Sequence, residues 1–117
     1  MSSMATRDAD RFRILKESLA SLGPVRRGTV LRRFIRCGRS ACLCQADPPK
    51  LHGPYYEWTR KVSGKTVSVR LTQEQARLMK QWIANARRLD RLVADMERAS
   101  LRMTERPFQD AAKPRKA

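Results

Sequence analysis

The chain has 117 residues, a length that suits a single domain with a modest core. It carries 26 basic and 11 acidic side chains, and this formal net charge of +15 predicts attraction to polyanions. No run of about 18 apolar residues is present, and residues 1–10 lack a hydrophobic signal core, so we expect neither a membrane span nor export. We therefore expect a cytoplasmic, nucleoid-associated location.

The first predicted element is a short amphipathic helix at residues 8–22. Apolar side chains recur at three- to four-residue spacing from Phe12 to Leu22, and Asp8 is placed to cap the helix start. Gly23-Pro24 then stops the helix. We assign residues 1–22 to this N-terminal helix.

A basic module follows at residues 23–71, with 11 basic and two acidic side chains. We predict one strand at 28–37 and two more at 55–62 and 65–71, the last two joined by a tight turn at Ser63-Gly64. The expected fold class is α+β, with a small three-stranded antiparallel sheet between an N-terminal and a long C-terminal helix.

All three cysteines and the only histidine lie in the loop between the first two strands. The predicted metal ligands are Cys37, Cys42, Cys44 and His52. Three thiols and one imidazole are the ligand set of a closed tetrahedral site, so we expect a knuckle that holds structural Zn²⁺. A catalytic zinc would need an open position and a nearby base, for which the loop offers only Asp47. Buried free cysteines without a metal are the other alternative.

Basic residues crowd this loop and the neighbouring strands. We predict that ten of them bind nucleic acid, with DNA favoured over RNA: Arg26, Arg27, Arg32, Arg33, Arg36, Arg39, Arg60, Lys61, Lys65 and Arg70. Contacts from Lys and Arg to phosphates dominate such affinity. The alternatives are a solvated cationic surface and a patch for an acidic protein. Tyr56 and Trp58 are expected to lie in the core under the long helix rather than to stack on bases.

A capping-box pattern at Thr72 and Gln75 begins a long helix, which we assign to residues 72–105. Its apolar residues repeat every seven positions, as in a coiled coil. We predict an interface with a second copy or a partner protein, formed by Trp82, Leu89, Leu92, Val93, Met96 and Met103. The N-terminal helix competes for the same surface. Residues 106–117 are expected to be a flexible basic tail.

The motif Cys-Gly-x3-Cys-x-Cys from Cys37, followed by His-Gly-Pro-Tyr from His52, resembles a group of small bacterial proteins of unknown function. Members occur in bacterial genomes and on mobile elements. The resemblance covers residues 23–95, implies the zinc site and the fold boundaries, and leaves the activity open. More loosely, the sheet pattern Tyr-x-Trp-x-Arg with Gly-Lys-Thr is similar to the arm-binding domains of phage-type integrases, which lay a three-stranded sheet in the DNA major groove.

The sequence thus predicts a non-enzymatic, zinc-stabilised nucleic-acid-binding protein, an accessory or regulatory factor of a mobile genetic element. The alternative function is a protein-interaction subunit or inhibitor within a larger nucleoprotein complex. We expect no enzyme, because the single histidine is assigned to the metal and no paired carboxylates or phosphate-cradling loop accompany it.

Overall fold

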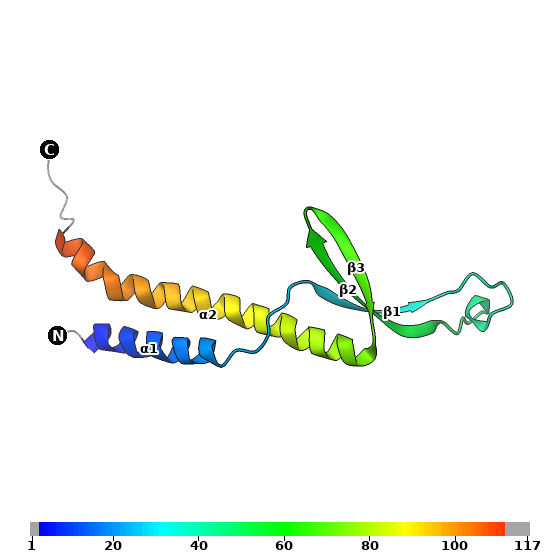
Figure 1. Cartoon of the computed structure of the whole chain (residues 1–117), viewed down its shortest axis with the longest axis horizontal. Coiled ribbons are helices and arrows are strands. Elements are labelled where there is room, and N and C mark those ends of the chain that lie inside the picture. The colour runs from blue at the N-terminus through cyan, green and yellow to red at the C-terminus, as the bar shows by residue number, and fades with distance from the viewer. Residues whose placement is uncertain (1–2, 112–117) are drawn as a thin grey trace. The chain divides into compact units, whose positions relative to one another are not determined.

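The computed structural model describes the backbone of residues 3–111 and the side chains of residues 6–105 (Figure 1). The elements follow in the order α1 (Ser3–Ala20), β1 (Thr29–Ile35), the 3-10 turn η1 (Leu43–Gln45), β2 (His52–Val62), β3 (Lys65–Leu71) and α2 (Gln73–Ala111). The predicted α+β class is confirmed. No helix in the described part of the chain is long and apolar enough to cross a membrane.

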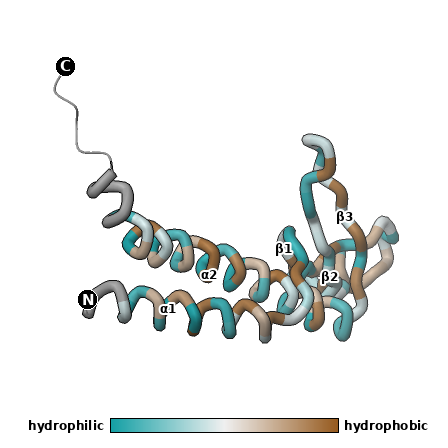
Figure 2. The backbone as a smooth tube through the Cα atoms, turned by 60° about the vertical axis from the view of Figure 1, so that its left-hand side comes forward, coloured by the Kyte–Doolittle hydropathy of each residue, from teal (hydrophilic) through white to brown (hydrophobic). Residues whose placement is uncertain are grey.

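The chain divides into two compact units. One unit, Pro24–Ala86, contains the sheet, η1 and the start of α2, and the other contains α1 and the part of α2 from Arg87 onward. In Figure 2, hydrophobic residues recur along α2 and along the strands. This patterning gives each element one apolar face to bury.

The sheet is antiparallel throughout, with strand order β1-β2-β3. The β2–β3 hairpin turns at Ser63 and Gly64, whose φ angles of 50° and 80° are both positive, as a two-residue hairpin turn requires. The predicted hairpin is confirmed at this turn. However, β2 begins at His52, three residues before the predicted start, and β1 ends at Ile35, before Cys37. The β1–β2 register shifts between Arg33 and Ile35, and this irregularity releases the chain into the loop.

The core of the Pro24–Ala86 unit forms between one sheet face and the start of α2. Trp58 on β2 is 5% exposed and packs with Met79 and Ile83 of α2. The indole N–H donates to the Arg27 carbonyl at 2.9 Å. A Cβ on Gly28, where φ is +122°, would lie 2.4 Å from the indole nitrogen, so only glycine fits there. The expectation that Trp58 belongs to the core is confirmed.

Helix α2 begins with the predicted capping box. The backbone N–H of Gln75 donates to Thr72 Oγ1 at 3.1 Å, and the backbone N–H of Thr72 donates to Gln75 Oε1 at 2.9 Å. The helix continues to Ala111, beyond the expected end at residue 105. Residues 112–117 of the predicted tail lie outside the described part of the chain.

In the other unit, α1 and α2 lie side by side and antiparallel (Figures 1 and 2). Leu15 of α1 and Leu92 and Ala99 of α2 are buried. The expected N-terminal helix is present but begins at Ser3, so Asp8 lies inside it instead of capping it. Asp8 instead accepts a hydrogen bond from Arg102 Nε of α2 at 2.9 Å.

Candidate metal centre and basic sheet face

The four predicted ligands come from the two ends and the middle of the loop that joins β1 to β2. Cys37 lies two residues after β1, and Cys42 directly precedes η1. Cys44 lies within η1, and His52 is the first residue of β2, where it pairs with Ile35 of β1. The sheet therefore fixes His52, while the loop folds back to bring the cysteines to it.

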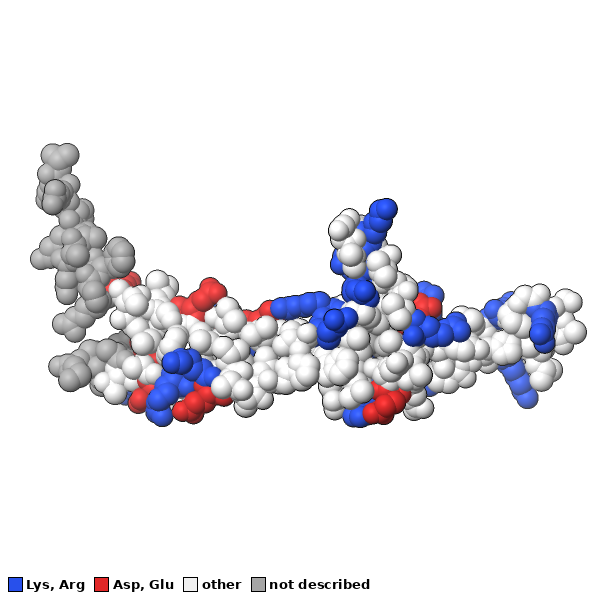
Figure 3. Space-filling view, viewed as in Figure 1, with Lys and Arg blue, Asp and Glu red and all other residues white. Residues whose placement is uncertain are grey.

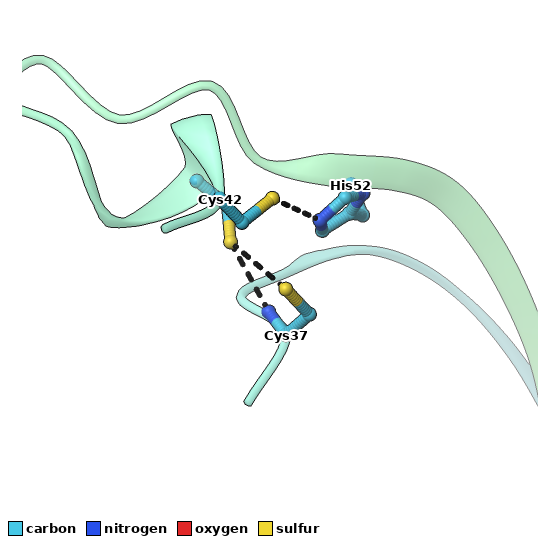
Figure 4. Close-up of side chains that lie close together, drawn as sticks. Cys37, Cys42 and His52 are labelled. Carbon is cyan, nitrogen blue, oxygen red and sulfur yellow. Dashed lines mark hydrogen bonds between the residues drawn. The ribbon is translucent and has the colours of Figure 1, made fainter. Parts of the chain in front are cut away.

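The ligand atoms of these four residues all lie within 4.8 Å of one another. The Sγ atoms of Cys37 and Cys44 are 3.5 Å apart, and Cys42 Sγ is 3.1 Å from His52 Nε2. Figure 4 shows the side chains of Cys37, Cys42 and His52 pointing toward one another. All three cysteines are free thiols, and Cys44 is completely buried. This arrangement is compatible with a metal site.

Glycine at position 53 allows the two strands to close on the cluster. Its φ is +136°, and a Cβ there would lie 2.6 Å from the carbonyl oxygen of Arg33 on β1. Any other residue would push β2 away from β1 immediately beside His52. The close approach of the strands at Gly53 thus helps to position the His52 imidazole beside the cysteines.

Hydrogen bonds within the cluster position the cysteines and stabilise negative charge on sulfur. The backbone N–H of Cys37 donates to Cys44 Sγ at 3.2 Å, and Gln45 Nε2 donates to the Cys37 carbonyl at 2.7 Å. The backbone N–H of Cys44, and then the thiols of Cys44 and Cys37, lower the pKa of Cys42 to about 6. The pKa of Cys44 is raised: the Cys37 backbone N–H lowers it, but burial and the neighbouring thiols outweigh that contribution. The Cys42 thiolate therefore forms readily. Several neighbouring thiolates would repel one another, so a bound cation would be needed to stabilise them together.

The sheet has a second face that does not pack on α2. Because side chains alternate along a strand, the register places Leu31, Tyr55, Glu57 and Arg70 on the face opposite Trp58. We call this surface the open sheet face; it carries Thr29, Leu31, Arg33, Tyr55, Glu57, Thr59, Lys61, Thr66, Ser68 and Arg70. It holds three cations, one acid and several hydroxyl groups.

The cations on the open sheet face are ordered by their neighbours. The guanidinium of Arg70 lies 4.4 Å from the centre of the Tyr55 ring, and the backbone of Arg70 on β3 is the register partner of Glu57 on β2. Arg33 Nη1 is 3.7 Å from Glu57 Oε2. Glu57 is thus ion-paired with Arg33 and lies opposite Arg70 in the strand register, and Lys61 has no ion pair among the described residues.

The structure separates the ten predicted nucleic-acid-binding residues into groups. Arg33, Lys61 and Arg70 lie on the open sheet face, whereas Arg32, Arg60 and Lys65 are on the strand positions of the other face. Arg26 and Arg60 stack on the Trp58 ring, at 4.5 and 3.9 Å from its centre. Arg27 precedes β1. Arg36 and Arg39 lie in the loop of residues 36–51 between β1 and β2, which carries the candidate metal ligands and which we call the metal-ligand loop. Figure 3 shows Lys and Arg side chains over the β2–β3 hairpin and around this loop.

The predicted partner interface on α2 is divided as well. Trp82 packs against the core around Trp58, and Leu92 is 7% exposed within the α1–α2 pair. Within its own unit, each of these two side chains is therefore already covered at least in part by the chain itself: Trp82 by the core around Trp58, and Leu92 within the α1–α2 pair. Leu89 and Met96 are half-buried, while Val93 and Met103 are exposed at 40% and 36%.

Sequence reasoning missed Tyr55 and Gln45. On the open sheet face, the Arg70 guanidinium stacks on the Tyr55 ring. The Gln45 side chain donates a hydrogen bond to the Cys37 carbonyl. Counting residues back from the Ser63-Gly64 turn would have assigned Tyr55 to the face of Arg70, because the hairpin register follows from the turn. No comparable signal marked Gln45.

The fold and the site define a small α+β protein with a Cys3His cluster beside an antiparallel sheet. A family model described as "Domain of unknown function (DUF6788)" matches residues 7–81, and the chain belongs to this family. The match confirms the predicted resemblance to a family of unknown function, although it begins within α1 and ends early in α2. Neither a search of curated proteins nor a search of solved structures gives a match.

Proposed function

We propose that this protein is a non-enzymatic, zinc-stabilised DNA-binding protein that contacts the duplex with its open sheet face. The observation that carries the proposal is the sheet itself: one face packs on α2, while the other presents three cations, Arg33, Lys61 and Arg70, and a single acid, Glu57. Cations of this kind contact phosphates, and hydroxyl and guanidinium groups hydrogen-bond to base edges.

Zinc is the metal that best suits the cluster. With bonds of about 2.3 Å to sulfur and about 2.0 Å to nitrogen, the ligand atoms of a tetrahedral zinc lie roughly 3.6–3.8 Å apart. The Sγ atoms of Cys37 and Cys44 are 3.5 Å apart, which is close to those values, while Cys42 Sγ and His52 Nε2, at 3.1 Å, are about 0.5 Å closer than that. The ligand atoms all lie within 4.8 Å of one another, so small side-chain rotations would bring them onto one ion. Four protein ligands leave no open position, so the role we assign to zinc is structural: it would hold the loop of residues 36–51 to the sheet.

The dimensions of the sheet favour duplex DNA over RNA. Three strands spaced by about 4.8 Å make a face roughly 10 Å wide, which fits a major groove of about 12 Å. The major groove of an RNA duplex is too deep and narrow for side chains to read. Arg36 and Arg39 of the metal-ligand loop would then reach the phosphates beside the groove.

The proposal is tested by removing the charges of the open sheet face. Arg33→Gln, Lys61→Gln and Arg70→Gln together should weaken binding of the zinc-loaded protein to a 20-base-pair DNA duplex by about 100-fold or more at 0.1 M salt, because three phosphate contacts are lost. Fluorescence anisotropy measures the affinity, and a matching RNA duplex should bind more weakly.

The matched control lowers the net charge equally elsewhere. Arg7→Gln, Arg11→Gln and Arg13→Gln on α1 remove three exposed cations of the other unit and should change the affinity much less. An equal loss in both triple variants would mean that only overall charge attracts DNA, and the proposed interface would be wrong.

A further inference from the structure

We infer that two copies of this chain associate through a groove on the α1–α2 pair and form a four-helix bundle. The groove has a volume of about 440 Å³ and lies between the two helices. Phe12 and Leu19 of α1 form one wall, and α2 contributes Val93, Met96, Glu97, Ser100, Leu101 and Thr104. This inference does not depend on the proposed function.

The α1–α2 pair buries too little apolar surface to account for the stability of two helices of this length. Among its described residues, only Leu15, Leu92 and Ala99 are buried. Helices in proteins gain most of their stability from packing an apolar face against a neighbour. In an isolated pair, each helix packs against one neighbour only. A second pair placed on the groove would cover Val93 and Leu101, which are 40% and 65% exposed.

The positions that line the groove form one stripe along α2. Val93, Met96, Ser100 and Thr104 follow one another at intervals of three and four residues, so they share a helix face. The Thr104 hydroxyl donates to the Ser100 carbonyl at 2.7 Å, which satisfies this polar group within the helix. The stripe can therefore be buried without leaving the hydroxyl unpaired.

Charge distribution selects this face over the opposite face of α2. A second stripe on α2 carries Arg88, Arg91, Asp95, Arg98 and Arg102, again at intervals of three and four residues. Arg98 is paired with Asp95 and Arg102 with Asp8. However, Arg88 and Arg91 of two copies meeting through this face would still repel, and every charge there would lose its hydration. Pairing through the groove leaves both arginine stripes in water on the outside of the bundle.

The groove face also carries one unpaired charge of each sign, which makes it self-complementary. Lys16 lies over the Phe12 ring at 5.9 Å, and it has no acidic partner among the described residues. Glu97 lines the groove and likewise has no cationic partner in this part of the chain. In a two-fold dimer, a patch meets the same patch of the second copy, so Lys16 of one chain can pair with Glu97 of the other. A second copy of this chain is therefore the occupant that the surface fits.

The test is the mass of the full-length, zinc-loaded chain in solution, measured by light scattering after nucleic acid has been removed at high salt. We expect a dimer at micromolar concentration. Val93→Glu with Leu101→Glu should raise the dimer dissociation constant at least about 100-fold, because each chain would bury two unpaired charges. Both side chains are exposed in the single chain, so its helix content by circular dichroism should not change.

Two further variants make the result specific. Ile14→Glu changes an apolar residue that is 55% exposed and does not line the groove, so this variant should remain dimeric. Lys16→Glu should weaken the dimer, and adding Glu97→Lys should restore it. A wild-type chain that stays monomeric at 0.5 mM, or equal dissociation by Ile14→Glu and the groove variant, would overturn the inference.

Discussion

Replacement of the buried Cys44 by serine tests the structural role that we propose for zinc. Cys44 is the only buried side chain in the loop of residues 36–51, and Leu43 within this loop is 63% exposed. The loop therefore has no apolar core of its own. We expect Cys44→Ser to abolish zinc binding and to unfold this loop, while the hairpin and α2 stay folded around Trp58.

The structure sets the magnitude of this effect. Ordering the 16 backbone residues of the loop costs about 1 kcal/mol each at least, or roughly 16 kcal/mol. Five hydrogen bonds from N–H groups to carbonyl oxygens within the loop contribute about 1 kcal/mol each. The remaining deficit of about 11 kcal/mol is similar to the roughly 10–16 kcal/mol that zinc binding supplies in small Cys/His sites. The loop should thus be ordered only with the metal bound.

Hydrogen exchange followed by mass spectrometry measures this directly. In Cys44→Ser, amides of residues 38–50 should exchange at least about 100-fold faster than in the zinc-loaded wild type, and chelation of the metal should have the same effect. Leu43→Ser is the matched control, because it changes the adjacent exposed residue and leaves all four ligands in place. Undiminished protection of the loop in metal-free protein would show that the metal does not order it.

Two substitutions test the packing that supports the sheet. Trp58→Phe keeps an aromatic ring under Arg60 but removes the indole N–H that donates to the Arg27 carbonyl, so the free energy of unfolding should fall by about 1–2 kcal/mol in urea titrations; an unchanged midpoint would mean that this bond contributes nothing. Thr72→Ala removes the cap of α2 and should cost about 1 kcal/mol, whereas Thr72→Ser should be nearly neutral. Equal stability of the alanine and serine variants would argue against the cap.

Local signals were sufficient to predict several features of this fold. The Ser63-Gly64 turn fixed the hairpin, because both residues adopt positive φ angles that few sequences favour. The capping box fixed the start of α2 through bonds between Thr72 and Gln75, which are only three residues apart. The clustering of the three cysteines and the histidine could be predicted because Cys37 and His52 bracket all the thiol and imidazole groups of the chain.

The remaining features depend on contacts between residues far apart in the chain. Asp8 was expected to cap α1, but its actual partner is Arg102, which the sequence alone does not connect to it. Leu92 was assigned to an external interface because periodicity identifies an apolar face without saying which element covers it. Likewise, the ten basic residues formed one group in the sequence. Only the sheet register separates Arg33 and Arg70 from Arg60, which stacks on Trp58.

The salt dependence of DNA affinity tests the central proposal most directly. If the open sheet face and the metal-ligand loop neutralise roughly six phosphates, the logarithm of the association constant should fall with the logarithm of the salt concentration with a slope of about −5. The zinc-loaded chain should be titrated with a duplex between 50 and 300 mM salt. A slope near −5 that becomes shallower by about 3 when Arg33, Lys61 and Arg70 are replaced by glutamine is the predicted result. A flat dependence, or no binding at the lowest salt concentration, would contradict the proposal that this protein binds DNA.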